Sequence, residues 1–96
     1  MDGRSPSKSQ NLIIKVFTMK TCPNCPYAKK MAKKIAEKYG LELVEIDLGT
    51  PEGQIEGLMH QIMSTPSIAL NDDVIVRGRL ISEEDFEREV RKRLKL

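Results

Sequence analysis

Two kinds of hydrophobic pattern follow each other in the first half of the chain, one typical of buried strands and one typical of amphipathic helices. Residues 11–18 form a β-branched and almost wholly apolar run, which predicts a strand buried on both faces of a sheet. Between Pro23 and Tyr39 the apolar residues share one helical face and lysines occupy the other, which predicts a helix that Gly40 ends. Residues 41–48 alternate apolar and acidic side chains, which predicts a second strand.

The next segment predicts a second helix that begins at Thr50-Pro51, because proline suits the first helical position. Gly53 and Gly57 weaken this helix by about 1 kcal/mol each relative to alanine. Its apolar residues recur at helical spacing, so we expect them to form a buried stripe. We expect the methionines of this stripe, together with Met31 of the first helix, to lie in the core. The stripe consists of Ile55, Leu58, Met59, Ile62 and Met63.

The last third of the chain predicts a hairpin of two short strands followed by a helix. The strands cover residues 67–70 and 74–77, a tight turn at 71–73 joins them, and Gly78 ends the hairpin. Ser82 is placed to cap the final helix, whose first turn is acidic and whose last turns are basic. The complete order is β-α-β-α-β-β-α. It predicts an α/β fold with a four-stranded mixed sheet, helices on both faces and a parallel first pair of strands.

Length and charge place limits on the domain organisation and the partners. We expect one domain over residues 11–96, preceded by a disordered leader over residues 1–10. The net charge of +2, from 16 basic and 14 acidic side chains, gives no argument for binding nucleic acid. No apolar run is long enough to span a membrane, and the N-terminus lacks the pattern of a secretory signal. Two cysteines without such a signal indicate a reducing compartment, so we expect a cytoplasmic location.

The chemistry predicted from the sequence centres on two cysteines separated by two residues. Cys22 follows the first predicted strand, at the carboxyl edge where open α/β sheets place their sites. We expect Cys22 to be the helix N-cap, with Pro23 the first helical residue and Cys25 the third. The positive end of the helix dipole then favours the Cys22 thiolate, so the pKa falls below the usual thiol value of about 8.5.

This arrangement predicts thiol–disulfide exchange, because two intervening residues bring the sulfurs within bonding reach. Cys22, at the outer position, should attack a substrate disulfide. Cys25, which points into the helix, should then resolve the mixed disulfide. Pro23 and Asn24 tune the turn between the cysteines. Pro26 has no N–H, so the hydrogen bond from residue 26 toward the Cys22 carbonyl is lost.

A Cys-x-x-Cys pair is also typical of metal sites, so a metal- or cluster-binding module that uses Cys22 and Cys25 is the alternative from a different functional class. A tetrahedral zinc site needs two further ligands. Only His60 is available as another nitrogen or sulfur ligand, and we expect it on the solvent side of the second helix as a surface residue. We therefore expect no metal site and no cofactor.

The run Cys22-Pro23-Asn24-Cys25-Pro26 after a strand, in β-α-β-α-β-β-α order, resembles the thioredoxin/glutaredoxin superfamily over roughly residues 12–96. The resemblance implies a thioredoxin-like fold and a disulfide oxidoreductase. It also implies a cis Thr65-Pro66 bond, with Pro66 facing the cysteines and the Thr65 backbone pairing with an extended substrate segment. Gly78 matches the glycine that keeps the substrate groove of thioredoxins open.

Three departures from that family narrow the expected partners. Thr21, which borders the groove, replaces the tryptophan that precedes the first cysteine of thioredoxins. The strand before the motif offers only Lys15 where thioredoxins bury an aspartate, so proton transfer at Cys25 falls to water or a backbone group. Residues 78–83 lack the Gly-Gly and acidic cap of glutathione-using glutaredoxins. We therefore expect a monomeric carrier that reduces protein disulfides with electrons from a reductase or another dithiol. A glutathione-linked glutaredoxin is the alternative within the class.

Overall fold

A computed structural model describes residues 12–96 of the chain, and the expected leader over residues 1–10 lies outside them. Seven elements follow one another in the predicted order. They are β1 (Ile13–Thr18), α2 (Cys25–Tyr39), β2 (Glu42–Asp47), α3 (Pro51–Met59), β3 (Ser67–Leu70), β4 (Asp73–Val76) and α4 (Glu83–Leu94). None of the helices in this part of the chain has the length and apolar character that crossing a membrane requires.

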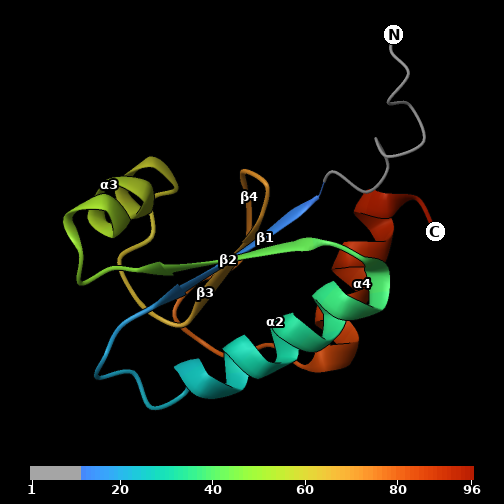
Figure 1. Ribbon diagram of the computed structural model, residues 1–96, viewed down its shortest axis with the longest axis horizontal. Coiled ribbons are helices and arrows are strands. Elements are labelled where there is room, and N and C mark those ends of the chain that lie inside the picture. Colours follow the sequence, from blue (N-terminus) through green and yellow to red (C-terminus); the bar gives the residue numbers. More distant parts are fainter. Residues whose placement is uncertain (1–11) are drawn as a thin grey trace, which may run out of the picture.

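The four strands form one mixed sheet in the order β2-β1-β3-β4. β1 runs parallel to β2 and antiparallel to β3, and β3 pairs with β4 as an antiparallel hairpin. α2 and α4 cover one face of the sheet, whereas α3 lies on the other (Figure 1). The predicted α/β fold, with a parallel first pair of strands and helices on both faces, is confirmed.

β1 is a central strand that separates two hydrophobic clusters. Ile14 and Val16 belong to a large buried cluster that also contains Phe86 of α4. Phe17 belongs to a smaller cluster on the other face, together with Ile62. Since successive side chains of a strand point to opposite faces, one apolar run serves both clusters. The burial on both faces that the sequence predicts for this strand is therefore confirmed. The chain continues to the cysteines from the carboxyl end of this buried strand, whose position is held by both clusters.

α2, the helix that carries Cys25, is tied to α4 by a polar link at its far end. Lys38 and Tyr39 both donate hydrogen bonds to the Glu87 carboxylate of α4. The hydrogen bond from Lys38 is the main reason that the pKa of Glu87 lies below its usual value, and the one from Tyr39 acts in the same direction. The helix that positions Cys25 is thus held at both its apolar face and its last turn.

The predicted apolar stripe of α3 does not face the core, and this expectation was wrong. Gly53 and Gly57 are the buried residues of the helix. A Cβ atom at Gly53 would overlap the backbone oxygen of Asp47, so the helix lies against the end of β2 through its glycine side, and its large side chains turn outward. Of the stripe, Ile62 is buried, and Met31 of α2 packs against the large cluster as expected. The other stripe residues are exposed: Ile55 60%, Leu58 68%, Met59 72% and Met63 83%.

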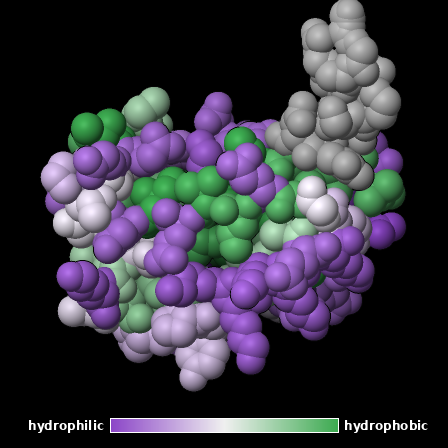
Figure 2. All heavy atoms as spheres, viewed as in Figure 1, coloured by the Kyte–Doolittle hydropathy of each residue, from purple (hydrophilic) through white to green (hydrophobic). Residues whose placement is uncertain are grey.

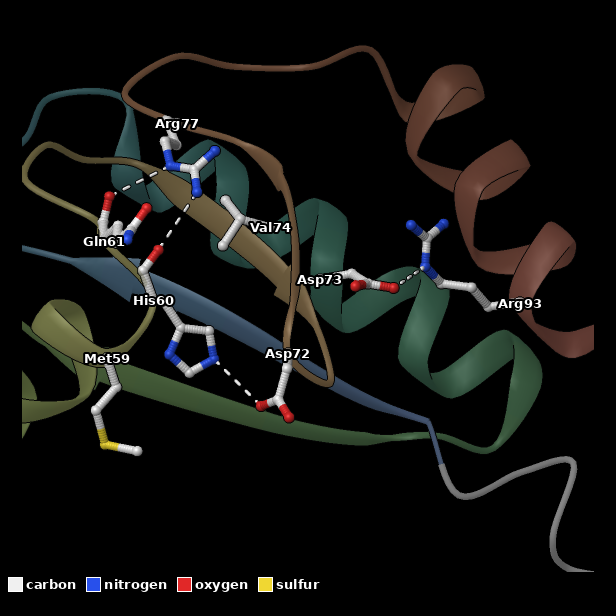
Figure 3. Close-up of a pocket in the computed structure, with 8 residues that line it drawn as sticks. All are labelled: Met59, His60, Gln61, Asp72, Asp73, Val74, Arg77 and Arg93. Atoms are coloured by element: carbon white, nitrogen blue, oxygen red, sulfur yellow. Dashed lines mark hydrogen bonds and ion pairs between the residues drawn. The ribbon is translucent and has the colours of Figure 1, made fainter.

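His60, expected on the surface, is 8% exposed and lies beneath the end of α3. Its ring packs beside Phe17, with the ring centroids 5.5 Å apart. The Nδ1 atom is 3.0 Å from the Glu56 carbonyl oxygen, and Nε2 is 3.4 Å from Lys15 Nζ. Figure 3 shows the ring directed at Asp72 of the hairpin, across a cleft of about 480 Å³. The expectation failed because α3 ends at Met59, before the predicted stripe is complete, so the chain turns at His60 and carries the ring under the helix.

The turn between β3 and β4 is one residue shorter than predicted. β4 begins at Asp73, so the turn residues are Asn71 and Asp72. Asn71 has a φ of 56°, and its side-chain oxygen accepts a hydrogen bond from the Ile13 N–H at 2.9 Å. Asparagine tolerates this left-handed conformation better than most residues, which explains how the hairpin closes without the favoured Asn-Gly pair.

Candidate active site

The two cysteines form a disulfide in the turn that leads from the carboxyl end of β1 into α2. Their Cα atoms are 5.4 Å apart. Cys25 is 3% exposed and belongs to the buried face of α2. Cys22, in contrast, is partly exposed. The pair therefore presents one accessible and one shielded cysteine, at the edge of the sheet that the sequence predicts.

The first turn of α2 differs from the expected one, because the helix begins at Cys25 and Asn24, not Cys22, is its N-cap. The Cys25 N–H donates to the Cys22 carbonyl at 3.4 Å, and the Ala28 N–H donates to the Asn24 carbonyl at 3.2 Å. Pro26 has no N–H to donate to the Cys22 carbonyl, so the helical hydrogen-bond pattern cannot extend back to Cys22. Cys22 thus lies in the turn just before the helix.

The other motif residues surround Cys22 at the surface. The Cys22 N–H donates to the Met19 carbonyl at 3.2 Å, so the chain turns once before the disulfide and again within it. A partner that approaches Cys22 therefore meets this double turn first. The motif residues Thr21, Pro23, Asn24 and Pro26 are exposed in and just after this double turn.

A hollow of about 230 Å³ lies beside the disulfide, and both cysteines line it. Glu45 of β2 lines the same hollow. Thr18 Oγ1 donates a hydrogen bond of 3.0 Å to Glu45 Oε2, and Lys29 Nζ lies 3.5 Å from the same oxygen. These contacts hold a carboxylate in the hollow that contains the shielded cysteine.

Glu45 was missed by sequence reasoning because it comes from a strand after α2 rather than from the strand before the motif. The parallel register pairs Glu45 with Val16 and Asp47 with Thr18, so both acidic residues lie beside the last residues of β1. The signal was the alternation of residues 41–48. It assigns the acidic side chains at 45 and 47 to one face, but it does not say which helix covers that face.

The Thr65-Pro66 peptide bond is cis, as the resemblance implies. Pro66 is buried and Thr65 is partly exposed. Ser67 pairs with Phe17 in the antiparallel register of β1 and β3, so the chain enters β3 at the edge where β1 ends. The structure thereby brings the Thr65-Pro66 segment to the same edge of the sheet as Cys22.

A buried serine joins this segment to Gly78. Ser67 Oγ donates to the Ser64 carbonyl at 2.6 Å and accepts a hydrogen bond of 3.0 Å from the Gly78 N–H. Gly78 has a φ of 72°, and a Cβ atom there would overlap the Ser64 hydroxyl. Only glycine fits this position without displacing its neighbours. The two segments expected at the substrate groove are therefore held together by one hydroxyl group.

Comparisons with known proteins agree with this geometry. A model of the thioredoxin domain matches residues 12–91. A probable thioredoxin of Archaeoglobus fulgidus is 32% identical over 84 residues, which are 88% of this chain and 90% of the relative. A thioredoxin of Methanocaldococcus jannaschii is also 32% identical, over 84% of this chain and 94% of its own length.

Solved structures show the same fold. A mutant thioredoxin from Halobacterium salinarum superposes with a TM-score of 0.76 at 17% identity, covering 95% of this chain and 82% of that one. Thioredoxin 1 from Thermosipho africanus gives a TM-score of 0.71 at 17% identity, over 86% of this chain and 94% of that one. The resemblance to the superfamily is confirmed by the family model and by the curated relatives. The chain belongs to the thioredoxin family, and it is a thiol–disulfide oxidoreductase.

Proposed function

We propose that this chain reduces the disulfides of other proteins, with Cys22 as the attacking thiol and Cys25 as the resolving thiol. The observation that carries the proposal is the difference in exposure between the two cysteines, since a substrate disulfide can reach the partly exposed Cys22 more readily than the buried Cys25. Thr21, Thr65, Pro66 and Gly78 border the substrate in this proposal. Pro23, Asn24 and Pro26 shape the turn that presents Cys22.

The proposed reaction runs in two displacement steps. The Cys22 thiolate attacks one sulfur of the substrate disulfide, which forms a mixed disulfide and releases the other substrate sulfur as a thiolate. Cys25 then loses its proton and attacks Cys22 Sγ, which forms the Cys22–Cys25 disulfide and releases the second substrate thiolate. Two electrons pass from the dithiol to the substrate. A reductase or another dithiol returns the pair to the reduced state.

The second step needs a proton acceptor, because a thiol attacks only as its thiolate. Glu45 serves this purpose in our proposal, since its carboxylate lines the same hollow as Cys25. Thr18 and Lys29 hold the carboxylate there by a hydrogen bond and an ion pair. A carboxylate in reach of the thiol, directly or through one water molecule, can receive the proton and pass it to solvent. This assignment adds a side chain to a step that the sequence left to water or the backbone.

Glu45→Gln should slow the release of substrate from the mixed disulfide about 3- to 10-fold, because the amide cannot take the proton. This slowing should be smaller than the loss of a buried general base would cause, because Glu45 is exposed and water can take the proton in its place. The first step should be unchanged. Stopped-flow measurement of the two thiol releases in a single turnover separates the steps.

The matched control is Glu42→Gln, which changes an exposed carboxylate on the same strand and the opposite face. Equal slowing in both variants, or no slowing in Glu45→Gln, would contradict the assignment of Glu45.

We further propose that the chain acts as a monomer in the cytoplasm. A carrier that meets many partners in turn needs its disulfide edge free. Acidic side chains on the exposed edge strand β2, including Glu42 and Glu45, disfavour pairing with the β2 strand of a second copy. A reducing compartment is also the setting in which a Cys-x-x-Cys pair works as a reductant rather than as a permanent crosslink.

The proposed function predicts that the chain accelerates the reduction of insulin by dithiothreitol, followed as the turbidity of the released insulin chain. No acceleration would contradict it. Two further outcomes would favour the alternatives. Activity that requires glutathione, and fails with dithiothreitol, would indicate a glutathione-linked glutaredoxin. Stoichiometric zinc or iron in freshly purified protein would indicate a metal-binding module.

A further inference from the structure

The chain between α3 and β3, which we name the 60–66 segment, connects the end of the helix to the Thr65-Pro66 bond. Ile62 lies in the smaller hydrophobic cluster, and the ring of His60 lies beneath α3. The large apolar side chains of α3 itself lie at the surface, as Figure 2 shows on the outer side of that helix, so they do not tie the segment to the core. Polar contacts at the two ends of the segment therefore matter for its position.

The segment starts in the turn that ends α3. The Ile62 N–H donates to the Gly57 carbonyl at 2.7 Å, and the Gln61 N–H donates to the Leu58 carbonyl at 3.1 Å. Gln61 has a φ of 56°. This is the pattern in which a helix ends through a left-handed residue. The carbonyl groups of His60 and Gln61 lie beyond the helical pattern, so they need donors from elsewhere in the chain.

Arg77 supplies both donors. Its Nε donates to the Gln61 carbonyl at 3.3 Å, and its Nη2 donates to the His60 carbonyl at 3.4 Å. Figure 3 shows the guanidinium group across these two carbonyl groups, reaching them from the end of β4. A planar guanidinium suits two neighbouring acceptors, and its positive charge lies at the negative end of the α3 dipole. One side chain thus ties the start of the 60–66 segment to the end of β4.

A bulge in β4 turns Arg77 toward α3. The pairing of β3 with β4 skips Ile75, which is an extra residue between Val74 and Val76. Val74 therefore packs against the smaller cluster and Val76 belongs to the large one. Because side chains alternate, Arg77 comes to the face that α3 covers, whereas in a regular strand it would face α2 and α4. Bulges beside functional sites commonly redirect a side chain in this way.

The residue after Arg77 is linked to the other end of the segment. The Gly78 N–H donates to Ser67 Oγ, and this hydroxyl donates to the Ser64 carbonyl. Two consecutive residues, Arg77 and Gly78, therefore connect to the 60–66 segment near its start and near its end. Since one peptide unit joins them, the two contacts keep a fixed separation.

We propose that Arg77 is a positioning residue, which holds the 60–66 segment so that the Thr65 backbone is in place before a polypeptide disulfide binds. The inference rests on the proposed function, in which Thr65 borders the substrate. Arg77 is not part of the disulfide hollow, so it leaves the exchange chemistry unchanged. A segment that is already ordered loses less conformational entropy on binding, which strengthens the binding of any substrate long enough to contact it.

The test is Arg77→Met, which keeps much of the side-chain length and removes both donors. Two substrates are compared, insulin as a polypeptide disulfide and 5,5′-dithiobis(2-nitrobenzoate) as a small disulfide without flanking residues. For insulin, KM should rise about 3- to 10-fold with kcat nearly unchanged, the scale expected for the loss of one or two hydrogen bonds. For the small disulfide, the rate constant should stay within about twofold of wild type.

Arg77→Lys separates the hydrogen bonds from the charge. An ammonium group keeps the positive charge at the end of α3 but lacks the planar pair of donors, so this variant should recover only part of the lost affinity for insulin. Full recovery in Arg77→Lys would overturn the proposal, because charge alone would then explain the effect.

Hydrogen exchange followed by mass spectrometry tests the position of the segment without any substrate. In Arg77→Met, the amides of the 60–66 segment should exchange about 3- to 10-fold faster than in wild type, and those of α2 should be unchanged. Unchanged exchange in the segment would overturn the proposal, whatever the kinetics show.

The matched control is Arg79→Met, which removes the same charge from an exposed arginine on the other side of Gly78. It should match wild type with both substrates. Thermal unfolding verifies that all variants are folded, as expected for substitutions of exposed side chains. Unchanged insulin kinetics in Arg77→Met, equal losses for both substrates, or an equal loss in Arg79→Met would overturn the proposal.

Failure of this inference and failure of the proposed function give different results. If wild type reduces neither substrate, the proposed function fails. If wild type reduces both and Arg77→Met matches it, only the role of Arg77 fails.

Discussion

Cys25→Ser protein mixed with a disulfide substrate will stay covalently attached to it through Cys22, whereas Cys22→Ser protein will not be attached. The reason is the order of the two displacements. Cys22 is the accessible cysteine, so in the proposed function it forms the mixed disulfide, and without the Cys25 sulfur no second cysteine of the protein can break that bond. The Cys22→Ser variant should also lose catalysed insulin reduction by at least about 10³-fold, because a serine hydroxyl at neutral pH does not replace a thiolate nucleophile.

Trapping is measured with reduced protein from which the free thiol reductant has been removed. The protein is mixed with insulin, alkylated, and examined by non-reducing electrophoresis and mass spectrometry. The double variant Cys22→Ser/Cys25→Ser gives the background of non-covalent association. The opposite pattern, with attachment in Cys22→Ser and none in Cys25→Ser, would exchange the two roles.

The second large effect concerns stability, because Gly53→Ala should destabilise the fold by about 2–3 kcal/mol. Helix propensity alone predicts the opposite sign, a gain of about 1 kcal/mol from replacing glycine with alanine in a helix. The structure reverses the sign, because the added Cβ would overlap the Asp47 carbonyl oxygen and push α3 away from the end of β2. The Thr50 cap, whose hydroxyl accepts a hydrogen bond from the Gly53 N–H at 2.9 Å, would be disturbed as well.

Urea unfolding followed by circular dichroism measures this change. Gln54→Ala, at the next position of the same helix and exposed to solvent, is the matched control and should alter the unfolding free energy by less than about 0.5 kcal/mol. A Gly53→Ala protein as stable as wild type would show that α3 does not need its close approach to β2.

The order of elements and the position of the cysteine pair were predictable because both depend on local patterns. The apolar run of β1, the lysine-rich face of α2 and the Ser82 cap of α4 each identify an element without knowledge of its neighbours. The junction of β1 and α2 then places Cys22 at the edge of the sheet. For the same reason the alternation in residues 41–48 correctly indicated β2.

The orientation of α3 was not predictable from hydrophobic spacing, because it depends on how closely two backbones approach. Either the glycine face or the apolar face of α3 could pack on the sheet. The distance between the backbones of α3 and β2 decides which of the two faces fits. His60 was misplaced for a related reason, since its burial follows from the turn that ends the helix. The position of Glu45 was not predictable either, because only the register of β1 and β2 brings this residue to the disulfide hollow.

The Ser67 hydroxyl joins two segments of the chain, the loop before Pro66 and the turn at Gly78. Its single oxygen donates to the loop before Pro66 and accepts from Gly78, so neither segment moves away from the other without breaking a hydrogen bond, at a net cost of about 1 kcal/mol. A small, buried side chain thus links the loop before Pro66 to Gly78. The separation of these two segments, which border the substrate in the proposed function, is therefore set from beneath by a buried hydroxyl group.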